Sequence, residues 1–307
     1  MNEKITIVTA FFPINRAEWK NFDRSNNKYI EYFKFWARIH NDMIIYTTPE
    51  FKDEIMKIRR EYGRSNTEVV TIENIYDIDR KLYDSILKVS KNRDSINFRF
   101  QPNSPESWNA EYNYIMILKE WAVVDAIKRY NLENTIAWVD FGFNHGGEVY
   151  TNPEDFNFEW NYNFGDKINL FLKHKLDDSE TIFNICRRMD TYVQGSVIVG
   201  PCDKWKKLWP MIRSEMIALN KVGLMDDDQT LLLMAYREDP EIFETHLLER
   251  WHSVFLHFSN QKFSFKKMDE FEIKGLKKIK MKLAFKKLVL KYSLKWNKIL
   301  NKKETLG

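Results

Sequence analysis

One acid in this chain directly follows a short apolar run, and we expect chemistry there. The run from Thr135 to Val139 is rich in β-branched and aromatic residues, as buried strands are, and Asp140 and Gly142 come next. Ligands of open α/β sheets bind just beyond the carboxyl ends of such strands. A carboxylate at that place can hold Mn²⁺ or Mg²⁺, and the cation can hold a diphosphate. In the alternative interpretation, Asp140 only caps the turn that follows.

A second group of acids could act at the same site. Asp226 to Asp228 precede an apolar run that begins at Leu231, so capping and the helix dipole account for part of this charge. One cap does not need three carboxylates. We therefore expect Asp227 or Asp228 to be a catalytic base or to bind a sugar hydroxyl.

Two histidines, His252 and His257, lie in a strand-like stretch from Trp251 to Phe258. A single histidine on an apolar face is usually a core residue, but neutral imidazole is also the commonest metal ligand. We predict that His257 is the second ligand of an ion at Asp140.

The end of the first expected strand offers a place for a nucleotide. This strand is expected to end at Thr9, and Ala10 and Phe11 follow it at a position where α/β proteins often admit a base and ribose. Arg16 follows with a planar guanidinium that suits phosphate, although an ordinary surface arginine fits the sequence equally well.

Glycine-rich phosphate loops are absent from the sequence. It contains neither a dinucleotide-binding motif nor a Walker loop, which argues against an NAD enzyme or a P-loop ATPase. Any diphosphate must then be held by a metal and by side chains. Gly195 opens a strand that ends at Gly200, and it permits either the close approach of a ligand or a bulge.

The elements that must position these residues alternate between strand and helix patterns. The expected strands cover residues 5–9, 43–46, 68–72, 135–139, 168–173 and 195–200. The expected helices cover residues 26–39, 51–62, 79–90, 109–130, 202–219 and 226–237. This rhythm predicts an α/β fold, with a mixed, mostly parallel sheet flanked by helices.

Length and composition favour a folded protein outside the membrane. The 307 residues suffice for one large α/β unit, and 44% hydrophobic residues are too many for disorder. Two cysteines, Cys186 and Cys202, are too few for a disulfide framework. The start of the chain lacks the regions of a signal peptide, and no run reaches the roughly 18 apolar residues of a spanning helix. We therefore expect a cytoplasmic protein.

Lysines are concentrated at the C-terminus. Residues 261–307 contain 15 lysines and four acids, a net charge of +11, so the first 260 residues carry −7 of the total of +4. Apolar residues recur there at helical spacing, namely Leu276, Ile279, Leu283, Phe285, Val289, Tyr292, Trp296 and Leu300. This pattern predicts a basic amphipathic helix on the anionic inner leaflet, peripheral at the cytoplasmic face of the inner membrane. Alternatively, the apolar stripe packs on the main domain. The lack of arginine in this tail argues against nucleic acid as a partner.

Several motifs together resemble the HtrL/YibB family of bacterial proteins. They are the stretch from Ile7 to Phe12 with Arg16 and Trp19, the aromatic pattern from Tyr32 to Trp36, the stretch from Ser107 to Tyr112 with Lys119, and Trp138-Val-Asp140-Phe-Gly142. The last of these is the most specific. The resemblance runs from about Lys4 to Asn260 and leaves the lysine-rich tail outside. This family is similar to GT-A glycosyltransferases and is associated with lipopolysaccharide or capsule assembly.

The resemblance implies a GT-A-like, Rossmann-like nucleotide-sugar domain over residues 1–260. The lysine-rich, helical pattern of residues 261–307 adds a membrane-association tail, which lies outside the resemblance. In GT-A enzymes a strand-end Asp-x-Asp binds Mn²⁺ or Mg²⁺ and the diphosphate of the donor, here first of all a UDP-sugar, and a late histidine often completes the shell. Asp140 matches the first acid, but Gly142 replaces the second. Asn144 or His145 substitutes for it, or Asp140 and His257 hold the metal alone, or no metal is needed.

The reaction expected from this resemblance moves a sugar to a glycan or lipid-linked acceptor of a cell-surface polysaccharide. Lys119 matches a cationic donor contact, and Asp226 to Asp228 resemble the acidic element near the acceptor. Two other functions stay open. One is a non-catalytic, membrane-associated sugar-binding or scaffold protein that has lost its metal site, for which Gly142 is the best argument. The other is a nucleotidyltransferase, which would release pyrophosphate from a nucleoside triphosphate.

Overall fold

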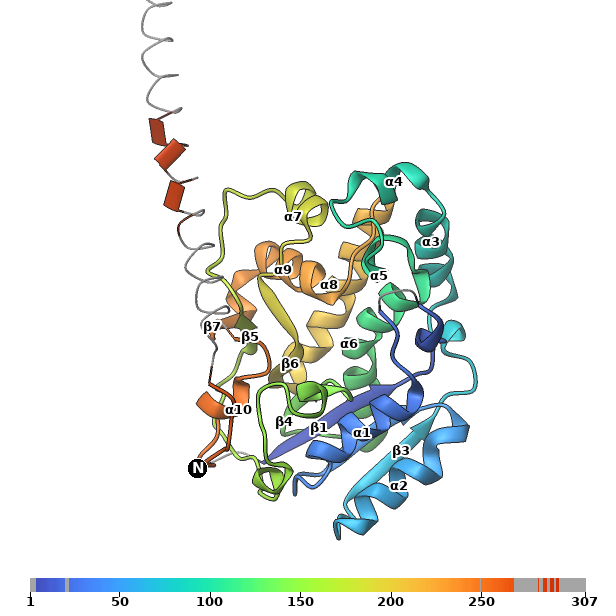
Figure 1. The fold of residues 1–307 in the computed structure, drawn as a ribbon, viewed down its shortest axis with the longest axis vertical. Coiled ribbons are helices and arrows are strands. Elements are labelled where there is room, and N and C mark those ends of the chain that lie inside the picture. Colours follow the sequence, from blue (N-terminus) through green and yellow to red (C-terminus); the bar gives the residue numbers. More distant parts are fainter. Residues whose placement is uncertain are drawn as a thin grey trace, which may run out of the picture. The chain divides into compact units, whose positions relative to one another are not determined.

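Figure 1 shows the computed structural model of the chain, which describes residues 4–19, 22–248, 250–267 and single helical positions between 281 and 292. The chain divides into two units, residues 1–265 and 266–307. The expected boundary at residue 260 therefore lies five residues before the observed one. Phe265 still belongs to the first unit, where it forms a β-bridge with Tyr150.

A seven-stranded sheet runs through the first unit. Its strands are β1 (Ile5–Phe11), β2 (Met43–Thr47), β3 (Thr67–Thr71), β4 (Thr135–Val139), β5 (Ile168–Leu172), β6 (Val193–Pro201) and β7 (Phe243–Leu247). Their order is β3-β2-β1-β4-β6-β5-β7. Within the described residues, β6 pairs antiparallel with β4 and β5, and the other neighbours pair parallel. The predicted α/β fold with a mixed, mostly parallel sheet is confirmed.

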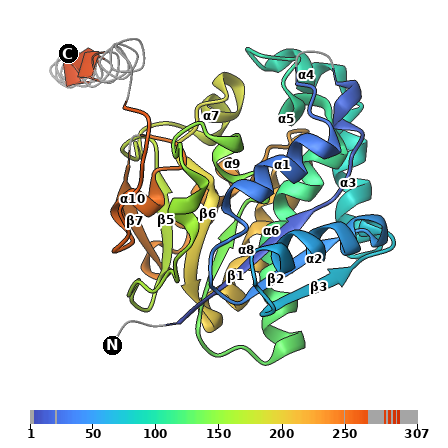
Figure 2. The same ribbon diagram turned by 60° about the horizontal axis from the view of Figure 1, so that its bottom comes forward.

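Helices cover both faces of this sheet (Figures 1 and 2). They are α1 (Asn26–Trp36), α2 (Lys52–Glu61), α3 (Arg80–Ser90), α4 (Arg93–Phe98), α5 (Pro105–Trp108), α6 (Ala110–Tyr130), α7 (Ile182–Arg188), α8 (Cys202–Lys221), α9 (Asp228–Glu238) and α10 (Val254–His257). One apolar core lies between the sheet and α3, α6, α8 and α9, and a second contains side chains of α1, α2 and α10. Successive side chains of β1 point to opposite faces of the sheet and therefore contribute to both cores: Ile7 belongs to one and Val8 to the other.

Several segments differ from the expectation, among them the short helices α4, α5 and α7, which were not predicted. The stretch from Trp251 to Phe258 is not a strand, because it turns into the short helix α10. A short apolar run is compatible with either structure, and periodicity cannot separate them. Strand β7 was not predicted, and it pairs with β5 at the edge of the sheet.

The sheet topology brings several chain segments to one edge. Strands β1, β4, β5 and β7 are parallel to one another and therefore end at this edge, whereas antiparallel β6 begins there. Ligands of α/β sheets usually bind at such an edge. Within the part of the chain that the structure describes, no helix is both long and apolar enough to cross a bilayer.

Candidate functional site at the carboxyl edge of the sheet

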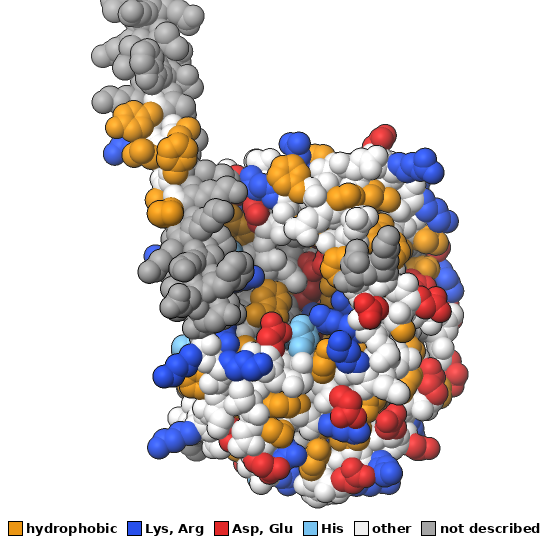
Figure 3. Space-filling view, viewed as in Figure 1, with side chains coloured by type: hydrophobic (Ala, Val, Ile, Leu, Met, Phe, Trp, Pro, Cys, Tyr) orange, Lys and Arg blue, Asp and Glu red, His pale blue; other side chains and the backbone are white. Residues whose placement is uncertain are grey.

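A cavity of about 360 Å³ opens at this edge of the sheet. The size is typical of small-molecule sites. Figure 3 shows the hollowed face, where acidic, basic and histidine side chains lie close together. Eight of the residues predicted from the sequence line the cavity: Ala10, Phe11, Arg16, Lys119, Asp140, Gly142, Gly195 and Asp228. Thr9, Asp227 and His257 do not line it.

An ionic group around Lys119 forms part of the cavity wall. Lys119 lies in the middle of α6 and is 3% exposed. Its Nζ lies 2.8 Å from Asp228 Oδ2, 3.0 Å from Asp140 Oδ1 and 3.0 Å from the carbonyl oxygen of Gly195. Burial by itself lowers the pKa of a lysine, but the two carboxylates outweigh it and hold the pKa of Lys119 above its ordinary value. The ammonium group is therefore charged and fixed between two acids.

Asp140 is the more accessible of these two acids. Its side chain is 33% exposed, whereas that of Asp228 is 2% exposed. Asp140 Oδ1 accepts a hydrogen bond from Trp138 Nε1 at 2.8 Å in addition to its ion pair with Lys119. Both donors approach Oδ1, so Oδ2 is the atom that Asp140 can offer to a ligand.

Each of the three successive acids has a structural partner, which corrects the expectation of a surplus carboxylate. Asp226 pairs with the buried Arg99, Asp227 caps α9, and Asp228 pairs with Lys119. Burial, followed by the neighbouring acids, raises the pKa of Asp227 well above its ordinary value. Asp227 thus fits the capping interpretation, and only Asp228 reaches the cavity.

Two glycines at the cavity lie close to neighbouring side chains. A Cβ atom on Gly195 would lie 1.7 Å from Asp228 Oδ2, so this glycine admits the Asp228 side chain and not a ligand. A Cβ atom on Gly142 would lie 3.2 Å from the Tyr29 ring. An aspartate at this position would therefore require the ring to shift by a few tenths of an ångström.

Two arginines line the cavity without a carboxylate oxygen within 4.0 Å among the residues that the structure describes. They are Arg16 and Arg24. Arg16 Nη1 donates to the Tyr29 hydroxyl at 2.7 Å, and its guanidinium lies 5.3 Å from the Trp19 ring centroid and 5.5 Å from that of Tyr112. These contacts hold the guanidinium in place without neutralising it. Its positive charge is therefore available for an anion.

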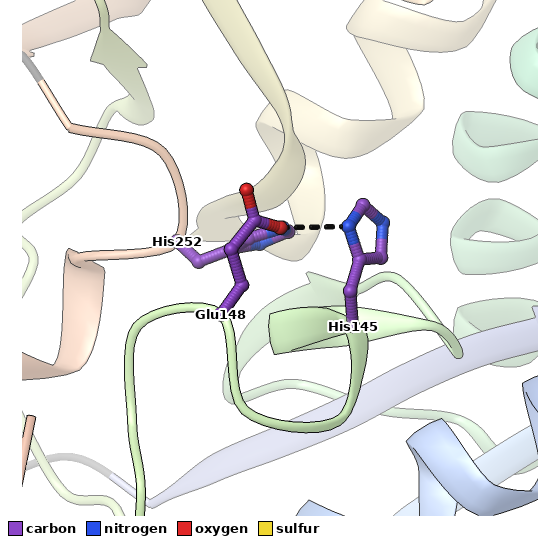
Figure 4. A group of neighbouring side chains, drawn as sticks. All are labelled: His145, Glu148 and His252. Atoms are coloured by element: carbon purple, nitrogen blue, oxygen red, sulfur yellow. Dashed lines mark hydrogen bonds and ion pairs between the residues drawn. The ribbon is translucent and has the colours of Figure 1, made fainter. Parts of the chain in front are cut away.

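Two histidines and a glutamate converge beside the same cavity (Figure 4). His145 and Glu148 follow β4, and His252 precedes α10. His145 Nδ1 lies 2.8 Å and His252 Nε2 lies 3.9 Å from Glu148 Oε2. The hydrogen bond from His145 lowers the pKa of Glu148 to about 2, and burial lowers the pKa of His252 to about 3. An ionised carboxylate thus lies beside a neutral, buried imidazole.

Of the two histidines considered from the sequence, His252 and not His257 lies at the cavity. His252 is 2% exposed and lines the cavity, whereas His257 is exposed at the end of α10 and does not. The location of His257 therefore corrects its predicted role beside Asp140. Thr9 is fully buried in β1 and is likewise outside the cavity lining.

Sequence reasoning did not single out Arg24, and it gave no role to Glu148. Arg24 comes from the loop before α1, and its Nη1 lies 3.2 Å from His145 Nε2. One available signal was the short distance in sequence between Asp140, His145 and Glu148, with Gly146 and Gly147 forming a tight turn between the last two.

Comparison with known proteins identifies bacterial relatives of this chain. The model of the family described as "Bacterial protein of unknown function (HtrL_YibB)" matches residues 3–260. Protein HtrL of Escherichia coli (strain K12) is 30% identical in an alignment of 279 positions that covers 84% of this chain and 93% of that protein. A solved structure of a cytidylyltransferase from Leptospira borgpetersenii serovar Hardjo-bovis (strain JB197) aligns over 86% of this chain and 82% of that chain, at 11% identity and a TM-score of 0.36. The family match includes every site residue from Arg16 to His252.

Proposed function

We propose, from the premise that this chain belongs to the HtrL_YibB family of bacterial proteins, that it transfers a sugar from a nucleotide-diphosphate sugar to a glycan or lipid-linked acceptor. One observation carries the proposal. A cavity at the carboxyl edge of the sheet combines two arginines that lack carboxylate partners among the described residues with an accessible acid, Asp140, held by a buried ammonium group.

Arg16 and Arg24 suit the diphosphate of such a donor. Guanidinium groups form charge-assisted, often paired hydrogen bonds with phosphate oxygens. Negative charge grows on the diphosphate when its bond to the sugar breaks, so donors placed in advance stabilise the transition state more than the ground state. Arg16 follows β1 in the sequence and lines the cavity together with Ala10 and Phe11, so the nucleoside is proposed to occupy this end of the cavity. UDP-sugars are the first donors to test.

Asp140 suits the acceptor. In the proposed reaction the acceptor oxygen forms a bond to the anomeric carbon, the bond from that carbon to the diphosphate oxygen breaks, and the hydroxyl proton goes to Asp140 Oδ2. Lys119 keeps the carboxylate oriented through Oδ1. Asp228 is a positioning residue, because it acts on Asp140 through Lys119.

The surroundings of Asp140 do not fit the Mn²⁺ or Mg²⁺ ion expected from the sequence. The Lys119 ammonium already neutralises Oδ1, and Gly142 supplies no second carboxylate beside it. The proposed reaction therefore uses no ion at Asp140. Arg16 and Arg24 supply the positive charge at the leaving group instead.

A binding experiment tests the diphosphate part of the proposal. Calorimetry with UDP, GDP and CDP should find one nucleoside diphosphate that binds, and Arg16→Gln should weaken it at least about tenfold, since a charged hydrogen bond contributes roughly 1.5–3 kcal/mol. Arg60→Gln is the matched control, because Arg60 is exposed on α2. Unchanged affinity in folded Arg16→Gln, or equal losses in both variants, would contradict the assignment.

A turnover experiment tests the acid. Wild-type protein is expected to hydrolyse one donor of a nucleotide-sugar panel slowly in water, and Asp140→Asn should reduce the rate by about 10²–10⁴ as a general base is lost. Asp166→Asn, on an exposed loop, is the control. Full activity in Asp140→Asn rejects this role. Nucleotide binding without turnover of any donor and acceptor would favour the non-catalytic sugar-binding protein, and pyrophosphate release from a triphosphate would favour the nucleotidyltransferase.

A further inference from the structure

We propose that His145, Glu148 and His252 bind a divalent ion of the first transition row at the border of the cavity. Their ligand atoms all lie within 4.8 Å of one another, and Figure 4 shows the three side chains pointing toward a common point. His145 and His252 also line the cavity that contains Asp140 and the two arginines. The ion site differs from the one expected at Asp140, since neither Asp140 nor His257 is among its ligands, although His145 was one of the residues considered for a second ligand there.

The strongest indication is the state of His252. Its ring is buried, and neither ring nitrogen has a hydrogen-bond partner within the described residues. A buried polar group without a partner costs about 1–3 kcal/mol, so such groups in folded proteins call for an explanation. Nε2 lies 3.9 Å from Glu148 Oε2, too far for a hydrogen bond but suitable for an ion between the two atoms. A neutral imidazole is the form that coordinates metals.

The backbone at these ligands is held in an uncommon conformation. His145 has a φ of 41° and His252 a φ of 60°, both in the left-handed region that residues other than glycine rarely adopt. The Asn144 side chain fixes the turn, because its Oδ1 accepts hydrogen bonds from the backbone nitrogens of Val149 and Tyr150. Strain of this kind is common at ligand sites, where the surrounding structure maintains it.

The ligand types indicate the class of ion. Two imidazoles and one carboxylate favour Zn²⁺, Mn²⁺ or Co²⁺ over Mg²⁺, which prefers oxygen ligands and water. Around an ion with bonds of about 2.0–2.2 Å, tetrahedral ligand atoms lie roughly 3.4 Å apart. The observed 2.8 Å and 3.9 Å bracket this separation, so small side-chain rotations suffice. Three protein ligands leave a coordination position open for a ligand in the cavity.

Ion binding should also change the state of Arg24. A guanidinium can only donate, so His145 Nε2 accepts from Arg24 and Nδ1–H donates to Glu148. An ion on Nδ1 moves the ring proton to Nε2, which then repels Arg24. The freed guanidinium lines the cavity and can bind phosphate. This last step rests on the proposed function, whereas the ion site does not.

Metal titration of the full-length chain tests the site without any nucleotide. After chelator treatment, Zn²⁺ or Mn²⁺ should bind at one ion per chain by calorimetry, and Co²⁺ should give the visible absorption of a low-coordinate complex. Mg²⁺ at the same concentration should not bind measurably. His252→Ala and Glu148→Gln should each weaken the first-row ions at least tenfold. Glu148 is half-exposed, so its substitution tests the site even if His252→Ala fails to fold.

Two control variants separate this site from the alternatives. His257→Ala removes the exposed histidine five residues further along and should leave ion affinity unchanged. Asp140→Asn should also leave it unchanged. The proposal is overturned if no ion binds stoichiometrically, if His257→Ala weakens binding as much as His252→Ala, or if Asp140→Asn abolishes binding while Glu148→Gln does not. Ion binding that persists in a protein unable to bind nucleotides would disprove the proposed function alone.

Discussion

At the scale of single residues, Lys119 decides the electrostatics of the site. Its ammonium takes the place beside Asp140 that sequence reasoning had given to a metal ion, and it also neutralises Asp228. Removing one partner of a buried ion pair costs much more stability than replacing both partners by apolar residues, because the other charge remains buried without compensation.

Lys119→Met is therefore expected to lower the free energy of unfolding by about 3–5 kcal/mol. Urea denaturation measures this loss. Lys128→Met on the same helix changes an exposed lysine and should stay within about 0.5 kcal/mol of the wild type. Similar stabilities for the two variants would show that the buried ammonium is not needed to compensate the acids.

Glu120, the next residue of α6, is fully buried, and its two carboxyl oxygens have no hydrogen-bond partner among the described residues. Burial, and then the charge of Asp228, raise the pKa of Glu120 from 4.5 to about 8. The folded state thus keeps a proton that the unfolded state releases near pH 4.5. The resulting stability is complete below that pH and is lost as the pH rises through about 8.

Glu120→Gln mimics the protonated acid and should remove this pH dependence. Between pH 5 and pH 9 the wild type is expected to lose roughly a few kcal/mol of stability relative to the variant. Thermal unfolding at both pH values measures the difference. Glu241→Gln, at an exposed position, should follow the wild-type profile. Parallel profiles for wild type and Glu120→Gln would mean that Glu120 is ionised in the folded protein.

At the scale of elements, the site depends on the antiparallel strand β6 between β4 and β5. Because β6 begins where β4 ends, the Asp140 backbone nitrogen donates to the Ser196 carbonyl oxygen at 2.8 Å, and the Gly195 carbonyl oxygen faces Lys119. The first residue of α9, Asp228, reaches the same point across Gly195. Three elements thus meet with no space for a Cβ atom at Gly195.

Gly195→Ala should destabilise the fold by about 1–3 kcal/mol, because its Cβ would overlap the Asp228 carboxylate. It should also displace Asp228 from Lys119. Gly142→Ala adds a Cβ at 3.2 Å from the Tyr29 ring and should cost less. Chemical denaturation of both variants gives the comparison. A larger loss in Gly142→Ala than in Gly195→Ala would contradict this account of the packing.

At the scale of the whole molecule, the chain combines an acidic α/β unit with a basic second unit. Within the latter, the structure describes exposed apolar side chains at Met281, Phe285, Leu288, Val289 and Tyr292, which recur at helical spacing. The other apolar positions of the predicted stripe lie outside the described residues. Association with an anionic membrane, as expected from the sequence, stays a proposal, and so does the access to lipid-linked acceptors that it would give.

Wild-type protein is expected to co-sediment with vesicles that contain anionic phosphatidylglycerol, less so at high salt, and not with neutral vesicles. Phe285→Asp with Val289→Asp should reduce binding at least about tenfold, because one buried aromatic or aliphatic side chain contributes roughly 1.5–3 kcal/mol. Phe183→Asp, at an exposed residue of α7, is the control. Equal binding to neutral and anionic vesicles, or unchanged binding of the double variant, would refute the membrane proposal.

Local sequence patterns were sufficient to predict the α/β class and most elements of the sheet. The apolar run before Asp140, the long helix with Lys119 and the strand before Arg16 all have the predicted structure. Buried faces give the apolar residues of a strand or helix a regular spacing, which can be recognised in the sequence. The same patterns also predicted that Asp140 and Arg16 lie at one edge of the sheet, since parallel strands end at the same edge.

Only the tertiary structure decided which residues of the site contact one another. Lys119 and Asp228 are 109 residues apart, and their ion pair exists because β6 runs antiparallel between β4 and β5. Likewise, a turn before α10 directs His252 and not His257 to the cavity. The spacing of apolar residues indicates which side chains are buried, but not which residues they contact. These contacts determine the charge states and the ligands of a site.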